Sequence, residues 1–369
     1  MIERQQVEAA WDRIRPYVRR TPVVEPKAGT FGISAPLALK LEQMQVSGSF
    51  KGRGAFHKLL ASKVPLAGVI AASGGNHGAA VAYAARALGH TAEIFVPTIA
   101  SPAKVERLKS YGAIVHQVGA VYAEARAASE KRAGETGALA VPAYEDPVVF
   151  AGAGSVALEF AEQATFDTLV VAVGGGGLIA GCALAIGAAT SIVAVETEGT
   201  PTLYKARRAG KPVEVKISGI AADALGASRI GAPNFEVVQK LVRESVLVSD
   251  EAVRTAQGAL WDELRLVAEP AGATGLAALM AGAYRPAPSE RVGVLICGAN
   301  TELASLRSDL LQGGMIDSRE AAELLQVFLM GRGYGVSPQA ALDAAGRVEM
   351  AGCSLPVLQL ELENLALVM

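Results

Sequence analysis

Cysteine and histidine are scarce in this chain of 369 residues. The three cysteines are Cys182, Cys297 and Cys353, and neither they nor the four histidines have a spacing typical of a structural metal site. An odd number of cysteines without a close pair does not indicate a disulfide-stabilised secreted protein. We therefore expect a protein of a reducing compartment and predict no metal.

An excess of charge of either sign is also lacking. The chain has 34 Lys and Arg against 36 Asp and Glu, a formal net charge of −2. Nucleic-acid binding requires a clearly basic face, and this balance of positive and negative charges does not indicate one. Because 51% of the residues are hydrophobic, the composition is that of a folded chain rather than a disordered one. The length suggests about two domains of roughly 150 residues each.

One uncharged run, from Thr168 to Val195, has the length of a membrane span. Four consecutive glycines, Gly174 to Gly177, interrupt this run and would break a helix. We interpret the run as a buried strand, a glycine loop and a buried helix. The chain begins with an amphipathic, acid-containing helix rather than a targeting peptide, so we expect a soluble, cytoplasmic protein without a membrane partner.

Short apolar runs alternate with helical segments over most of the chain. The apolar runs lie at 68–73, 92–97, 113–118, 138–144, 168–173, 191–196, 245–250 and 291–297. Continuous apolar strands separated by helices indicate parallel sheets covered on both faces. We predict an α/β fold with two such units. After Asn300 the pattern weakens to one helix over 318–330 and another near 338–347.

The glycine run at 174–177 follows a buried strand and opens a helix, where free N–H groups and the helix dipole favour an anion. Gly175, Gly177 and Ala180 also match a dinucleotide-binding fingerprint, with Glu196 as its acidic residue. Taken alone, the run leaves open a tight turn without a ligand, a nucleotide site and a site for another phosphate.

Two further segments carry chemistry. The small-residue loop 47–54 delivers Lys51 beside Phe50, and a lysine held against an apolar wall has a lowered pKa and can form Schiff bases. The segment 73–78 (SGGNHG) follows a strand and opens a helix, where it offers donors to a carboxylate. The plainer alternatives are a solvated surface lysine and a helix cap.

Together with Cys297-Gly298-Ala299-Asn300, these segments resemble the serine/threonine dehydratase family of pyridoxal-phosphate enzymes. That family has fold type II, like the tryptophan synthase β subunit. The resemblance covers residues 5–305 in order and includes the segments 144–147 (YEDP) and Glu269-Pro270. It implies two three-layer α/β domains with mainly parallel sheets and a short C-terminal extension. The large, cofactor-binding domain would span 1–46 and 148–310, the small domain 47–147 and the extension 311–369.

The resemblance also implies the roles of individual residues. Lys51 would bind pyridoxal phosphate as a Schiff base and act as the base at Cα, and Glu269 would lie near the reacting carbons. The implied cofactor-binding residues are Lys51, Phe50, Asn76, Gly174, Gly175, Gly176, Gly177, Leu178 and Cys297. The implied substrate-binding residues are Ser73, Gly74, Gly75, Asn76 and His77.

The implied activity is dehydration and deamination of L-threonine, L-serine or both to a 2-oxo acid and ammonia, by a homodimer or homotetramer. A threo-3-hydroxyaspartate ammonia-lyase and a serine racemase are alternatives, although racemases carry a second serine where this chain has Gly74. A nicotinamide oxidoreductase using Gly175, Gly177 and Glu196 is a remoter alternative. A non-catalytic amino-acid sensor would have lost the lysine, and Lys51 is present.

Overall fold

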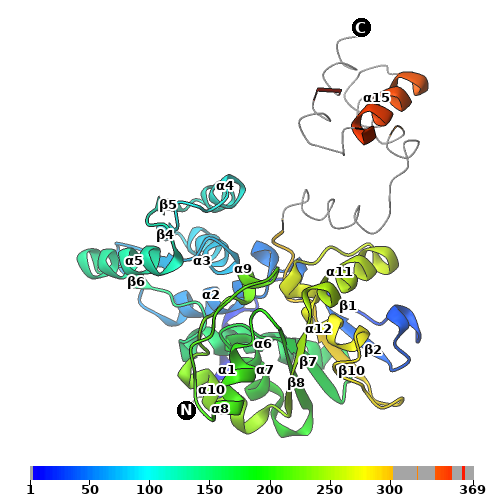
Figure 1. The fold of residues 1–369 in the computed structure, drawn as a ribbon. Helices are drawn as coiled ribbons and strands as arrows, with labels where there is room; N and C mark the ends of the chain where they lie inside the picture. Colours follow the sequence, from blue (N-terminus) through cyan, green and yellow to red (C-terminus); the bar gives the residue numbers. More distant parts are fainter. Residues whose placement is uncertain (1–2, 302–321, 323–336, 351–359, 362–369) are drawn as a thin grey trace. The chain divides into compact units, whose positions relative to one another are not determined.

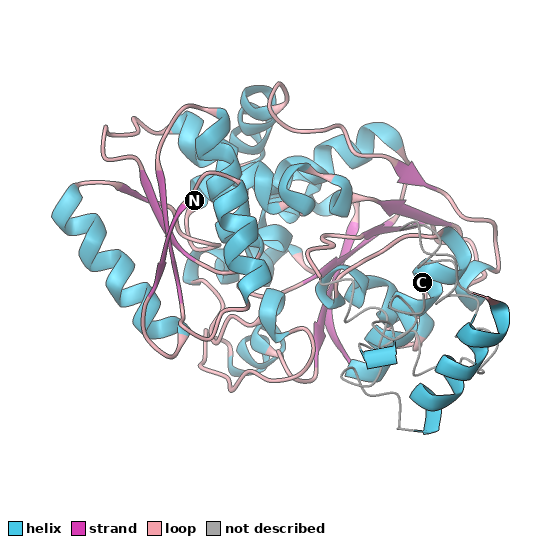
Figure 2. Cartoon of the chain, turned by 90° about the horizontal axis from the view of Figure 1, so that it is seen from above, coloured by secondary structure: helices cyan, strands magenta, loops and turns pink. Residues whose placement is uncertain are grey.

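A computed structural model describes residues 3–301, 322, 337–350 and 360–361. The chain divides into two compact units, Met1–Thr301 and Glu302–Met369. The first unit contains two separate sheets, each with helices packed around it (Figures 1 and 2). The predicted α/β fold with two mainly parallel sheets is thereby confirmed.

The larger sheet has six strands, all parallel except for the antiparallel pair β1 and β2. In order across the sheet, the strands are β1 (Val23–Val24), β2 (Leu37–Lys40), β10 (Val292–Leu295), β7 (Thr168–Ala172), β8 (Ser191–Thr197) and β9 (Glu244–Val248). Leu169 and Val171 of β7 face one hydrophobic core, and Val170 faces another. Apolar side chains on both faces are what a sheet covered on both sides requires.

Helices cover both faces of the six-stranded sheet (Figure 1). The first core contains side chains of α1 (Arg4–Ile14), α6 (Pro147–Gln163), α7 (Gly177–Ile186), α8 (Thr202–Ala209), α9 (Ala222–Leu225) and α10 (Ala232–Leu241). The core on the opposite face contains side chains of α11 (Asp250–Leu264) and α12 (Pro270–Met280). Short 3-10 helices lie at η1 (Thr30–Gly32), η2 (Glu42–Met44), η3 (Val46–Gly48) and η4 (Gly187–Ala189).

The smaller sheet has four parallel strands. Their order is β5 (Ile114–Gln117), β4 (Ala92–Val96), β3 (Val69–Ala72) and β6 (Leu139–Ala140). One face packs on α2 (Lys51–Ala61), α3 (Asn76–Ala87) and α4 (Pro102–Ser110), and the other on α5 (Tyr122–Thr136). Ser101 begins α4 as predicted, because its side chain accepts a hydrogen bond from the Lys104 N–H at 3.4 Å.

The uncharged run at 168–195 folds as strand β7, a glycine loop and helix α7, as predicted. Among the residues that the structure describes, no helix is long and apolar enough to cross a membrane. The second unit contains α15 (Pro338–Met350), which matches the helix expected near 338–347. The helix expected over 318–330 lies outside the described residues except for Ala322. The division into domains at 47, 148 and 311 stays a prediction.

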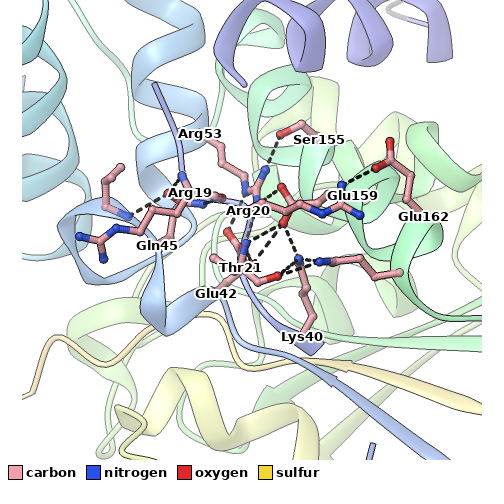
Figure 3. A network of polar contacts seen from close by, with 12 residues as sticks. Arg19, Arg20, Thr21, Lys40, Glu42, Gln45, Arg53, Ser155, Glu159 and Glu162 are labelled. Carbon is pink, nitrogen blue, oxygen red and sulfur yellow. Dashed lines mark hydrogen bonds and ion pairs between the residues drawn. The ribbon is translucent and has the colours of Figure 1, made fainter. Parts of the chain in front are cut away.

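A buried network of charged side chains anchors helix α2 to the larger sheet (Figure 3). Arg53 of α2 donates two hydrogen bonds to Glu42, at 2.8 and 2.7 Å, and a third to Glu159 of α6 at 2.9 Å. Lys40 at the end of β2 donates to Glu159 and, at 2.7 Å, to the Thr21 carbonyl. The four charged side chains are at most 1% exposed. The network fixes α2 and therefore the lysine with which that helix begins.

Candidate active site

The loop before Lys51 is held by the segment that follows strand β10. The Phe50 N–H donates to the Cys297 carbonyl at 3.1 Å, and the Ala299 N–H donates to the Gly48 carbonyl at 3.0 Å. Gly48 has a φ of 78°, which glycine adopts without strain. These contacts bring the predicted lysine loop and the predicted cysteine segment together.

Lys51 is the first residue of α2, and the residue is partly buried. The Nζ atom donates to the Ala143 carbonyl at 2.8 Å and lies 5.2 Å from the centroid of the Phe50 ring. Burial lowers the pKa of Lys51 to about 8. The side chain lines a small cavity together with Gly177 and Leu178 of the glycine loop and helix α7. About a tenth of the amine is therefore uncharged at pH 7, far more than for an ordinary lysine, and the uncharged amine is the nucleophile.

The glycine loop between β7 and α7 has the form of an anion site. Within residues 3–301, the N–H groups of Gly174, Gly175 and Gly176 donate to no protein acceptor. Gly176 has a φ of 88°, and a Cβ on Gly175 would lie 2.3 Å from the Tyr144 ring. Only glycine fits at these two positions, and the free N–H groups at the start of α7 favour a bound anion.

Asn234 supports this loop and was not predicted from the sequence. Its fully buried side chain donates to the Gly175 carbonyl at 2.8 Å and to the Tyr144 carbonyl at 2.9 Å. Its Oδ1 atom has no partner within the described residues. Asn234 thus ties the loop to the segment 143–145, whose Ala143 carbonyl accepts the hydrogen bond of Lys51.

The segment 73–78 joins β3 to α3, as predicted. The Ser73 hydroxyl accepts from the Gly75 N–H at 3.2 Å. The N–H groups of Asn76 and His77, in the first turn of α3, have no acceptor among the described residues. The His77 ring hydrogen-bonds the Val141 carbonyl at 2.8 Å, and burial lowers its pKa to about 3. His77 therefore offers the site its backbone N–H group, while its neutral ring is hydrogen-bonded to the residue that follows β6.

Asn76 connects the start of α3 to Glu269 and Asn300. Its Nδ2 atom donates to Glu269 Oε1 at 2.6 Å, and its Oδ1 atom accepts from Asn300 Nδ2 at 2.6 Å. Glu269 precedes α12 and is 4% exposed. Burial and the nearby Asp223 raise the pKa of Glu269 to about 7, against the lowering effect of the Asn76 N–H. Glu269 can therefore hold or release a proton near neutral pH.

Cys297 is buried beside this group. Its thiol donates to the Ala271 carbonyl at 3.4 Å, and burial raises its pKa. The side chain is a neutral thiol at neutral pH and cannot balance a full positive charge.

The dinucleotide interpretation of Glu196 is not supported by its position. Glu196 lies at the end of β8 and is fully buried. Its carboxylate accepts the N–H groups of Leu203 at 2.6 Å and Tyr204 at 2.7 Å. It caps the start of α8, so it is not free to hold a ribose hydroxyl.

Replacing Glu269 by glutamine is expected to change the pH dependence of stability. The pKa of Glu269 rises from its ordinary value of 4.5 to about 7 on folding. The folded state therefore holds the proton more tightly, and the wild type loses stability as pH rises through 7. Relative to the wild type, the free energy of unfolding of Glu269→Gln should increase by roughly 2 to 3 kcal/mol between pH 5 and pH 8.

Urea unfolding of both proteins at the two pH values measures this difference. Glu263→Gln, which removes an exposed carboxylate from α11, controls for the change in net charge. A stability difference between Glu269→Gln and the wild type that is the same at pH 5 and pH 8 would contradict the prediction.

Comparisons with known proteins agree with this arrangement. The family described as "Pyridoxal-phosphate dependent enzyme" matches residues 14–298. The chain is similar to the L-threonine ammonia-lyase of Geobacter sulfurreducens, 34% identical over 349 residues, which cover 93% of this chain and 83% of that protein. It is 36% identical over 313 residues to the phenylserine dehydratase of Ralstonia pickettii, covering 81% of this chain and 93% of that protein. The structure of maize serine racemase superimposes with a TM-score of 0.78 at 33% identity, covering 84% of this chain and 97% of the other.

Proposed function

The chain belongs to the pyridoxal-phosphate dependent enzymes, and we propose that it dehydrates L-threonine, L-serine or both to a 2-oxo acid and ammonia. Pyridoxal phosphate is its cofactor. The proposal is carried by Lys51, whose side chain lines a small cavity with Gly177 and Leu178 and whose amine has a pKa lowered by burial to about 8. The names of the relatives support elimination of water from a β-hydroxy-amino acid.

The residues of the site fit the cofactor. The free N–H groups of Gly174, Gly175 and Gly176 suit a phosphate group, because they lie at the start of α7. Lys51 is a primary amine with a pKa of about 8, so it can form a Schiff base with an aldehyde. The neutral thiol of Cys297 suits a ring nitrogen that does not carry a full positive charge.

When bound, pyridoxal phosphate supplies an electron sink at the substrate Cα. The free N–H groups of Asn76 and His77 hold the substrate carboxylate at the start of α3. Lys51 takes the proton from Cα, and the protonated form of Glu269 gives a proton to the departing hydroxyl. The protonated hydroxyl leaves as one water and one water is consumed in releasing ammonia, so the net products are the 2-oxo acid and ammonia.

Gly74 favours elimination over racemisation. Racemisation needs a proton donor on the face of Cα opposite Lys51, and Gly74 has no side chain to provide one. A Cβ at this position would lie 3.5 Å from Val96 Cγ1, which is ordinary van der Waals contact. A serine would therefore fit, and its absence is a difference in chemistry rather than a packing requirement.

The test is release of 2-oxo acid by the purified protein with pyridoxal phosphate. L-threonine, L-serine, threo-3-hydroxyaspartate and phenylserine are offered in parallel, and the remaining serine is analysed for its D-enantiomer. We expect release from threonine or serine to exceed racemisation by at least about tenfold. The two substrates differ by one methyl group, which a pocket distinguishes by about 1–3 kcal/mol.

Release from hydroxyaspartate or phenylserine alone would replace the proposed substrate and keep the reaction. Accumulation of D-serine without 2-oxo acid would replace the reaction by racemisation. No product from any of the four, with the cofactor bound, would reject the proposed function.

A further inference from the structure

We propose that Asn300 is a positioning residue that fixes which way the Asn76 amide points, so that its NH₂ group faces Glu269. This inference rests on the proposed function for the use to which the Glu269 proton is put. The orientation itself can be tested without turnover.

The direction of the hydrogen bonds follows from a backbone carbonyl. Asn300 Nδ2 donates to the Ser47 carbonyl at 2.8 Å and to Asn76 Oδ1 at 2.6 Å. A carbonyl oxygen can only accept, so the Ser47 carbonyl requires the NH₂ end of Asn300. That NH₂ group can only donate, so Asn76 must present its oxygen to it. The NH₂ end of Asn76 is then directed at Glu269, at 2.6 Å.

Packing holds Asn300 in this position. A Cβ on Gly48 would lie 2.4 Å from Asn300 Oδ1, so the asparagine occupies the space that a larger residue at position 48 would fill. The Ala299 N–H bond to the Gly48 carbonyl fixes the backbone next to Asn300. The Asn300 side chain is therefore fixed by the lysine loop, and through its hydrogen bond it fixes the orientation of the Asn76 amide.

The orientation matters because Glu269 is poised between two protonation states. The groups around it come from several elements: Asp223 of α9 raises its pKa, while Asn76 of α3, Arg107 of α4 and the Asn300 backbone N–H lower it. The Cys297 thiol beside it stays neutral. If Asn76 turned over, its carbonyl oxygen would face the carboxylate, which would then hold its proton more tightly. The NH₂ group of Asn76 has two hydrogens, so one remains for the cofactor while the other holds Glu269.

The test measures the pKa of Glu269 directly in the holoenzyme without substrate. The infrared band of its protonated carboxyl group, identified by its loss in Glu269→Gln, is followed as a function of pH. Asn300→Leu removes the donor without adding charge. We expect it to raise the pKa of Glu269 by about one, which is a tenfold lower dissociation constant for the proton. Asn76→Ala should raise it at least as much.

The decisive comparison is the double variant. If Asn300 acts through Asn76, Asn300→Leu adds no further shift in the Asn76→Ala background. Gln257→Leu is the matched control, since it removes an amide that donates to the Ala268 carbonyl at 2.8 Å, next to Glu269, but lies outside this chain of bonds. It should lower stability and leave the Glu269 band unchanged.

An unchanged band in Asn300→Leu would overturn the proposal, and so would an equal shift with and without Asn76. Failure of the proposed function is a separate outcome, because it would leave the band and its shifts intact and remove only product release.

Discussion

Lys51→Ala should lower 2-oxo acid release by about a thousandfold or more and leave the protein folded. The variant removes both the nucleophile and the base at Cα, and loss of positioned proton transfer alone costs about 10²- to 10⁴-fold. The fold should survive because, within the part of the chain that the structure describes, the amine makes one hydrogen bond, to the Ala143 carbonyl. Initial rates under saturating cofactor and substrate measure the effect.

Lys63→Ala is the control, because Lys63 is an exposed lysine just after the same helix. It should retain wild-type activity. Near-ultraviolet circular dichroism of Lys51→Ala should match that of the wild type, and the visible absorption of a lysine-bound cofactor should be missing. Retention of a tenth or more of the wild-type rate would show that another group performs the chemistry assigned to Lys51.

Local sequence patterns were sufficient for most of the fold. The apolar run of β7 and the glycines after it predict a buried strand and a turn, because both preferences act over a few neighbouring residues. Strand β2 was not predicted. It ends in Lys40, and a lysine can be fully buried there because its amine finds acceptors elsewhere in the chain, Glu159 and the Thr21 carbonyl among them.

The site residues likewise fall into those that local patterns predict and those that they do not. Lys51 and the glycine loop can be predicted because each belongs to a motif of contiguous residues. Asn234 was missed because it acts by donating to the Gly175 and Tyr144 carbonyls, and no local pattern marks a residue for such contacts. Asn300 was noted only as part of a motif. Its link to Asn76 depends on the packing of α3 against the lysine loop.

The roles of the predicted site residues stay proposals, although the structure refines two of them. The Nε2 atom of His77 is hydrogen-bonded to the Val141 carbonyl, so we assign the substrate contact of this residue to its backbone N–H group. The Cys297 thiol donates to the Ala271 carbonyl, which fixes the direction of that hydrogen. These hydrogen bonds join residues that are distant in the sequence, so local sequence patterns cannot predict them.

Arg53→Met should lower the free energy of unfolding by about 3–5 kcal/mol, the usual cost of removing one partner from a buried ion pair. The arginine satisfies Glu42 through two hydrogen bonds and Glu159 through a third. Methionine fills similar space and leaves two buried carboxylates with one cation, Lys40. Burial by itself would raise the pKa of Glu42, but the guanidinium outweighs it and the pKa is lowered. Losing Arg53 removes that compensation.

Urea unfolding at neutral pH measures the loss, with Arg15→Met as the control for an exposed arginine. The ion pair of Arg15 with Asp12 spans 3.8 Å between side chains that are more than half exposed, so its removal should cost less than about 1 kcal/mol. Adding Glu42→Gln to Arg53→Met should recover part of the stability, because the unpaired charge is then absent. Arg53→Lys should be intermediate, because it keeps the charge but cannot form the double hydrogen bond to Glu42.

If Arg53→Met were as stable as the wild type, the network would contribute nothing to the free energy of unfolding. Its function would then be to fix the position of α2. In that case Arg53→Met would displace Lys51, two residues away on the same helix. The expected result is a lower rate of 2-oxo acid release at unchanged stability. A loss of several kcal/mol that Glu42→Gln partly reverses would instead place the effect in the unpaired carboxylates.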